Sequence, residues 1–165
     1  DQEYTNNSWG YTEQYGTHPA DNRDRFNVGW YAYENQSINY KMPLKAGSYD
    51  LTFGFKEWWS QYRPMKVSAS YTLANGEPVT QTLFTATING SDIITPKASL
   101  TLPQDALVNF TVAKNGGSDP VLSYFSVQQA IDHTALISAL EQTPTGSAPL
   151  SCRFPAHTGQ RCSGG

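Results

Sequence analysis

Residues 55–63 carry the densest group of side chains able to recognise a ligand, Phe-Lys-Glu-Trp-Trp-Ser-Gln-Tyr-Arg. Neighbouring side chains of a regular strand face opposite sides, so Trp58 and Trp59 cannot both enter a core if a strand continues through them. At least one indole ring is therefore expected to be exposed or to line a cleft. We favour Trp59 as the exposed ring, because the alternating strand before it is expected to end at Lys56.

An exposed indole beside polar groups has the composition of a sugar site. The C–H face of a pyranose stacks on an aromatic ring, while carboxylate, guanidinium and amide groups pair with its hydroxyls. Glu57, Tyr62 and Arg63 could supply such groups next to Trp58 and Trp59. A structural interpretation stays open, in which one Trp lies in the core, the other covers the edge of the fold, and Arg63 stacks on it.

A second aromatic group lies at residues 30–35. Tyr31 and Tyr33 are expected to share one face of a strand, with Trp30 on the other face. The two tyrosines are further candidates for a sugar site, although an aromatic strand start more often belongs to a core.

Motifs of catalysis are missing from the sequence. His18, His133 and His157 lie near neither a Cys nor a Ser-centred motif, and no phosphate-binding glycine loop occurs. A pair of carboxylates acting as glycosidase acid and base stays open, but only 14 Asp and Glu residues are present. We therefore expect no enzyme and no cofactor.

A glycine-rich loop spans residues 115–119. Asn115 and Asp119 carry oxygen atoms of the kind that Ca²⁺ prefers, but nothing in their spacing specifies a metal site. A plain connection between strands is the favoured interpretation, and no metal site is predicted.

Composition argues against several partners and favours β-structure. The net charge of −3 provides no electrostatic footprint for nucleic acid or an anionic membrane. No apolar run approaches the roughly 18 residues that span a bilayer. Aromatic residues make up 13% of the 165 residues and charged residues only 15%, while Tyr, Thr, Ser, Asn and Gly dominate, a composition typical of strands joined by tight turns.

Alternation with a period of two predicts an all-β fold. The strongest run covers residues 49–56 and places Phe53 in its centre, on the face expected to form the core. Asn75-Gly76 predicts a type I′ hairpin turn. With no helical period between the runs, about seven or eight strands indicate a β-sandwich. The runs cover residues 38–42, 49–56, 65–72, 79–87, 100–102, 108–112 and 121–127.

The pattern changes after Gln129. Asp132 can cap a helix whose apolar face is formed by Leu136, Ile137 and Leu140. We thus expect a β-sandwich module over residues 1–130, a short helix or linker over 131–143, and a tail over 144–165. Cys152 and Cys162 in that tail could pair, but a disordered linker or a tail added for expression is favoured. A start at Asp1 without Met suggests an excised or processed chain.

Two segments resemble galactose-binding-like carbohydrate-binding modules of bacterial secreted glycoside hydrolases. They are Leu44-Lys45-Ala46-Gly47-Ser48-Tyr49-Asp50-Leu51-Thr52-Phe53, preceded by Trp30, and Val121-Leu122-Ser123-Tyr124-Phe125-Ser126-Val127. The resemblance spans residues 28–129 and implies a jelly-roll β-sandwich that binds an oligo- or polysaccharide without changing it. It also implies a secreted or cell-surface location and adjacent domains of a parent enzyme. Many such modules hold a structural Ca²⁺ through an Asp in the final strand, where this sequence has Ser123 and Ser126.

Residues 132–140 resemble the opening of small helical repeats that follow catalytic and sugar-binding modules in bacterial surface enzymes. Two other functions stay open. The chain could be a structural interdomain β-sandwich that packs against a catalytic domain, with the Trp pair as a protein anchor. It could also be a small lyase or hydrolase on a jelly roll.

Overall fold

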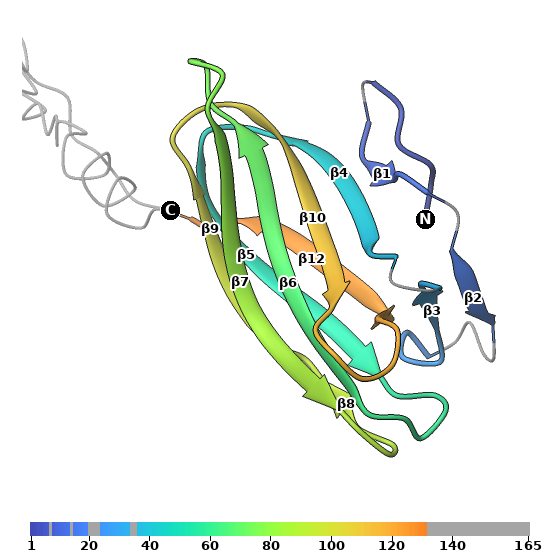
Figure 1. The fold of residues 1–165 in the computed structure, drawn as a ribbon. Helices are drawn as coiled ribbons and strands as arrows, with labels where there is room; N and C mark the ends of the chain where they lie inside the picture. The colour runs from blue at the N-terminus through green and yellow to red at the C-terminus, as the bar shows by residue number, and fades with distance from the viewer. Residues whose placement is uncertain (7, 14, 20–23, 34–35, 132–165) are drawn as a thin grey trace, which may run out of the picture. The chain divides into compact units, whose positions relative to one another are not determined.

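The computed structural model describes residues 1–6, 8–13, 15–19, 24–33 and 36–131. All regular structure in these residues is β-strand (Figure 1). No helix able to span a bilayer occurs in this part of the chain. The twelve strands are Gly10–Tyr11 (β1), Gly16–Pro19 (β2), Val28–Tyr31 (β3), Ile38–Leu44 (β4), Gly47–Lys56 (β5), Arg63–Thr72 (β6), Pro78–Ile88 (β7), Ile93–Ile94 (β8), Lys97–Leu102 (β9), Ala106–Lys114 (β10), Val121–Leu122 (β11) and Tyr124–Gln129 (β12).

Two antiparallel sheets face each other across the core. One has five strands in the order β1-β4-β10-β6-β7, and the other is built on β5, which pairs with β12, β8 and β9. Figure 1 shows the five-stranded sheet in front of the sheet built on β5. A smaller sheet, β11-β3-β2, continues beside β12. The predicted β-sandwich is therefore confirmed.

Alternating apolar residues place one face of β5, β6 and β10 in the core. In β5, Leu51, Phe53 and Phe55 are each at most 1% exposed, while Asp50, which precedes Leu51, is exposed and Thr52 is half-buried. The partner strand β12 adds Phe125, whose ring stacks on Phe53 at 5.6 Å. Side chains at every second position lie on the same face of a strand, so this pattern fixes which face of β5 meets the core.

The hairpin between β6 and β7 differs from the predicted type I′ turn. That turn needs positive φ at both central residues, but only Gly76 has it, at 86°. The Gly76 N–H donates to the Leu73 carbonyl at 2.9 Å, and the Glu77 N–H donates to the Asn75 side-chain oxygen at 3.0 Å. Asn75 thus stabilises the turn through its side chain.

The period of two in the sequence does not reveal the short strands. The structure adds β1, β2 and β8, and it divides the predicted strand over 121–127 at Ser123 into β11 and β12. These strands are two to four residues long apart from β12, too short for a period of two to be visible. The helix expected over 131–143 and the tail over 144–165 lie outside the described residues from position 132 onward.

Candidate functional site

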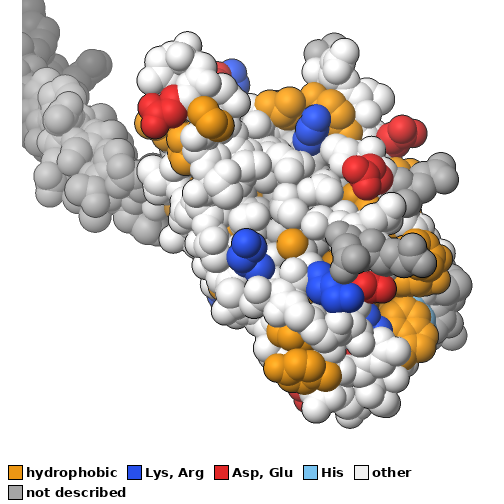
Figure 2. All heavy atoms as spheres, viewed as in Figure 1, with side chains coloured by type: hydrophobic (Ala, Val, Ile, Leu, Met, Phe, Trp, Pro, Cys, Tyr) orange, Lys and Arg blue, Asp and Glu red, His pale blue; other side chains and the backbone are white. Residues whose placement is uncertain are grey.

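A pocket of about 280 Å³ opens where β3, the β5–β6 loop and the β10–β11 loop meet. We call it the Trp59 pocket. Figure 2 shows a largely polar face with several groups of hydrophobic side chains, one of them at the lower right, toward the end that carries β3 and the β5–β6 loop in Figure 1. The pocket is lined by Tyr31, Ala32, Tyr33, Trp59, Gln61, Arg63 and Asp119.

Three aromatic rings form one wall of the Trp59 pocket. The Tyr31 ring lies 5.0 Å from Tyr33 and 5.0 Å from Trp59, in both cases edge to face. The Tyr33 hydroxyl donates a hydrogen bond to the Tyr31 hydroxyl at 3.0 Å, and this bond raises the pKa of Tyr33. Trp59 is 41% exposed and Tyr33 is 50% exposed. The wall is therefore held together internally while two of its rings remain open to solvent.

Glu57 and Arg63 form a buried ion pair behind that wall. Their side chains are 0% and 4% exposed, and the Arg63 Nε–H donates to Glu57 Oε2. The remaining guanidinium nitrogens donate to the Asp119 carbonyl and, at 2.6 Å, to Gln61 Oε1. The sequence predicts that Glu57 and Arg63 pair with ligand hydroxyls. Burial contradicts this for Glu57. Arg63 is a positioning residue, because it is 4% exposed and each of its three guanidinium nitrogens already donates to a protein acceptor.

The β5–β6 loop holds Trp59 in place by several contacts. Glu57 Oε1 accepts the Trp59 N–H at 2.7 Å, and the Arg63 guanidinium carbon lies 5.2 Å from the Trp59 ring centre. The next residue, Ser60, has φ of 56°, a left-handed conformation that costs an L-residue about 1–2 kcal/mol. Such strain persists only where surrounding contacts impose it, and it is common at functional loops.

Trp58 has a different environment from its neighbour. Its indole N–H donates to the Phe26 carbonyl at 2.8 Å, and its ring stacks on His18 at 4.6 Å and 3°. It packs against the core, whereas Trp59 is exposed and lies nearly perpendicular to it at 89°. The expectation that the two rings have different environments, with Trp59 the exposed one, is confirmed.

The structure therefore brings together only part of the predicted set. Tyr31, Tyr33, Trp59 and Arg63 line one pocket, with Glu57 behind it. Trp58 packs away from the pocket, and Tyr62, which is 56% exposed, does not line it.

Three lining residues were not predicted as site residues: Ala32, Gln61 and Asp119. Gln61 lies within residues 55–63, the stretch that the sequence predicts to bind a ligand, so it could have been included among the candidates. Asp119 was weighed only as a calcium ligand, but its carbonyl accepts from Arg63 and its carboxylate pairs with Lys114 at 3.2 Å. Within the described residues, no group of His, Cys, Asp and Glu has the arrangement of a metal site.

Gly16 of β2 leaves the space that Tyr31 occupies. The two residues pair across the β2–β3 ladder, and a Cβ atom at Gly16 would lie 2.2 Å from Cζ of the Tyr31 ring. The Tyr31 ring thus lies directly over Gly16, so the missing side chain at Gly16 determines where this part of the aromatic wall lies.

The likeness to known proteins lies in the fold. This chain has the β-sandwich fold of carbohydrate-binding modules from bacterial xylanases. No protein-family model matches the sequence, and the comparison with curated proteins finds no match.

Three solved structures illustrate the likeness. The CBM22-1 xylan-binding domain of Xyn10C from Paenibacillus barcinonensis aligns with a TM-score of 0.56 at 8% identity, over 77% of this chain and 88% of that domain. The CBM22-2 xylan-binding domain of the same protein gives 0.51 at 8%, over 76% and 94%. The CBM22-1–GH10 modules of xylanase 10B from Clostridium thermocellum, complexed with xylohexaose, give 0.56 at 13%, over 75% of this chain but only 26% of that one. At these identities the likeness is one of fold.

Proposed function

We propose that this chain is a non-catalytic carbohydrate-binding module with a jelly-roll, galactose-binding-like fold. It acts as an accessory to a glycoside hydrolase, secreted or at the cell surface, beside other domains of the parent enzyme. One observation carries the proposal: the Trp59 pocket combines exposed aromatic rings with polar groups held by a buried ion pair. The fold likeness to xylan-binding domains supports it.

The pocket supplies both kinds of contact that a sugar needs. The exposed parts of Trp59 and Tyr33 offer flat apolar surface for the C–H face of a pyranose. The Tyr31 hydroxyl accepts the hydrogen bond from Tyr33, so its own O–H can donate to a ligand. The side-chain carbonyl oxygen of Gln61 accepts a hydrogen bond from Arg63, so its amide NH₂ group is left as a donor for a ligand. These donors fit the oxygen atoms of sugar hydroxyls.

We further propose that the ligand is a neutral β-1,4-linked chain such as xylan. Asp119 lines the pocket with its side chain paired to Lys114, so the lining carries no net surplus of positive charge to attract an acidic sugar. The open form of the pocket suits internal sugar units of a chain. Xylohexaose is therefore the first oligosaccharide to test.

Removing Trp59 should abolish binding while leaving the fold intact. We expect Trp59→Ala to weaken xylohexaose binding by more than roughly tenfold, equivalent to about 1.4 kcal/mol, because the stacking surface is lost. The free energy of unfolding should change by less than about 1 kcal/mol, since the ring is 41% exposed. Isothermal titration and a urea melt measure the two effects.

Trp58→Ala is the matched control for this test. It should lower the free energy of unfolding by about 2 kcal/mol or more, because its ring packs on the core and on His18. Unchanged affinity in Trp59→Ala, or no binding of any glycan by the parent, would refute sugar binding at this pocket.

Gly16→Ala tests the aromatic wall without changing a lining residue. The new methyl group would displace the Tyr31 ring, so we expect roughly tenfold weaker xylohexaose binding. Thr17→Ala, an exposed change in the same strand, is the control and should bind like the parent. If Gly16→Ala binds normally at an unchanged melting temperature, Tyr31 has no part in recognition.

An interdomain role remains a second candidate, favoured by Tyr62. This residue is 56% exposed and lies outside the pocket, and exposed Tyr and Trp residues are typical anchors of protein interfaces. If no glycan binds but Tyr62→Ala and Trp59→Ala both weaken association with the neighbouring catalytic domain, the segment is a docking surface.

A further inference from the structure

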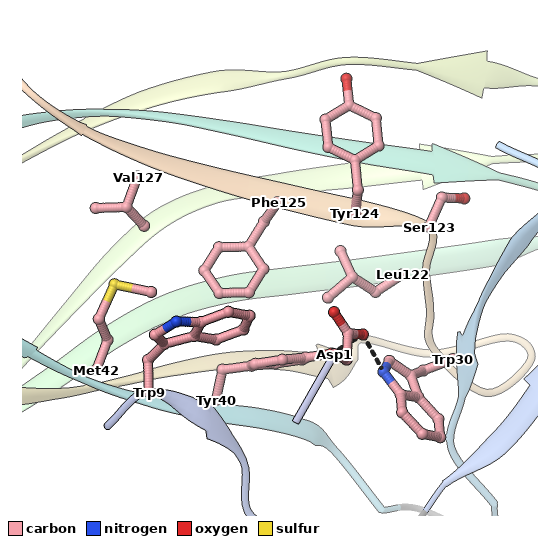
Figure 3. A pocket seen from close by; sticks show the side chains of 10 residues that line it. All are labelled: Asp1, Trp9, Trp30, Tyr40, Met42, Leu122, Ser123, Tyr124, Phe125 and Val127. Carbon is pink, nitrogen blue, oxygen red and sulfur yellow. Dashed lines mark hydrogen bonds between the residues drawn. The ribbon is translucent and has the colours of Figure 1, made fainter. Parts of the chain in front are cut away.

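A second pocket, of about 210 Å³, opens on another side of the sandwich (Figure 3). We call it the Trp9 pocket. It lies between β4, the neighbour of edge strand β1 in the five-stranded sheet, and β12 of the opposite sheet. It shares no lining residue with the Trp59 pocket. Its lining includes Asp1, Trp9, Trp30, Tyr40, Met42 and Phe125.

Aromatic and apolar groups form most of the Trp9 pocket. The rings of Tyr40 and Phe125 lie 4.9 Å apart at 66°, and Figure 3 shows Met42 and Trp9 directed toward the same space. Tyr40 is buried, whereas Trp9 is 41% exposed and forms an open wall. A ring-shaped ligand would therefore meet aromatic surface within the pocket and at its mouth.

A fixed carboxylate provides the polar group. Asp1 Oδ2 accepts two hydrogen bonds of 2.8 Å, from the Trp30 indole N–H and from the Tyr40 hydroxyl. Burial raises the pKa of Tyr40, so its hydroxyl stays protonated and keeps donating at neutral pH. Both bonds are made to one oxygen, which leaves Oδ1 as a charged acceptor for a ligand hydroxyl. The Ser123 hydroxyl lines the pocket but points away from Asp1 in Figure 3.

We propose that the Trp9 pocket is a second binding site, which takes one neutral pyranose ring. Its volume of about 210 Å³ is smaller than that of the Trp59 pocket, and residues of both sheets line it, so it suits one sugar ring better than a chain. Aromatic faces match the C–H surface of the ring, and the held carboxylate matches its hydroxyl donors. An anionic sugar is disfavoured by the same carboxylate. This site does not depend on sugar binding at the Trp59 pocket.

Fluorine NMR of the full chain labelled with 5-fluorotryptophan can report on both pockets at once. The chain has four Trp residues, of which Trp9 and Trp30 line this pocket and Trp59 lines the other. We expect D-xylose, D-glucose or D-galactose, added to about 100 mM to cover millimolar Kd values, to shift the Trp9 and Trp30 resonances saturably. Xylohexaose should shift the Trp59 resonance, so failure at one pocket is distinguishable from failure at the other.

Asp1→Asn is the decisive variant, because it keeps the shape of the side chain and removes the charge. We expect the monosaccharide affinity at the Trp9 resonance to fall at least fivefold, while Asp105→Asn, a surface aspartate paired with Lys45, leaves it unchanged. Three results would overturn the proposal. The first is no shift of the Trp9 resonance with any monosaccharide, and the second is the same monosaccharide affinity in Asp1→Asn as in the parent. The third is a Trp9 shift caused by tetramethylammonium but by no monosaccharide. The last would make the pocket an aromatic cage for a cation.

Discussion

Replacing Glu57 by alanine should lower the free energy of unfolding by about 3–5 kcal/mol, the usual loss when one partner of a buried ion pair is removed. The substitution leaves the Arg63 guanidinium charged and 4% exposed, without the carboxylate that compensates it. It also removes the acceptor of the Trp59 N–H. A urea melt followed by far-UV circular dichroism measures the change.

A surface ion pair is the appropriate control for Glu57→Ala. Lys45 and Asp105 pair at 2.7 Å, but their side chains are 82% and 59% exposed, so Lys45→Ala should leave the unfolding midpoint unchanged within error. The double change Glu57→Leu with Arg63→Met should recover much of the lost stability, because apolar pairs can replace buried ion pairs. A loss below about 1 kcal/mol in Glu57→Ala would mean that the pair is solvated.

Phe53→Ala is the second change with a large expected effect, a loss of about 3–5 kcal/mol in the free energy of unfolding. The ring is 1% exposed and lies 5.4 Å from Phe84 and 5.6 Å from Phe125. It therefore joins both sheets of the sandwich, and its removal leaves a cavity that neither can fill. Chemical denaturation of both proteins gives the difference directly.

Leu107→Ala, in β10, provides the comparison for Phe53→Ala. Leu107 is 45% exposed, so its truncation should change the free energy of unfolding by less than about 0.5 kcal/mol. If Phe53→Ala is equally mild, the core face of β5 has been assigned to the wrong set of residues.

The sequence predicts the strands of the sandwich wherever a long period of two exists. Residues 49–56 are the best case, because every second side chain of β5 enters the core and the strand ends at Lys56 as expected. Continued alternation would place Trp59 on the face of Phe53 and Phe55, so its exposure was expected only because the strand ends at Lys56. Beyond the strand end the alternation no longer decides where a side chain points, so the separate contacts of Trp58 could not be derived.

Other features depend on contacts between residues distant in sequence. Glu57 and Arg63 stand in a polar stretch that suggests exposure, but both are buried, and Arg63 donates to the Asp119 carbonyl, 56 residues away in the sequence. The strands β2 and β3 pair with each other, and β3 also pairs with β11, but each is only four residues long, so a period of two shows little in their own residues. The hydrogen bonds that Asp1 accepts come from Trp30, 29 residues away in the sequence, and from Tyr40, 39 residues away, so no local pattern could predict them.

The division of the last strand at Ser123 has a consequence for biosynthesis. Val121 pairs with Tyr31, while Tyr124 pairs with Gly54, so one late segment completes both the small sheet and the sheet built on β5. At about 5–20 residues per second, a ribosome adds Val121 roughly 5–20 s after Tyr31. During that interval Trp30 and Tyr31 of the nascent chain lack β11, the strand with which they pair in the folded module. Such exposed segments favour aggregation, so this small module should need chaperone protection until its final strand emerges.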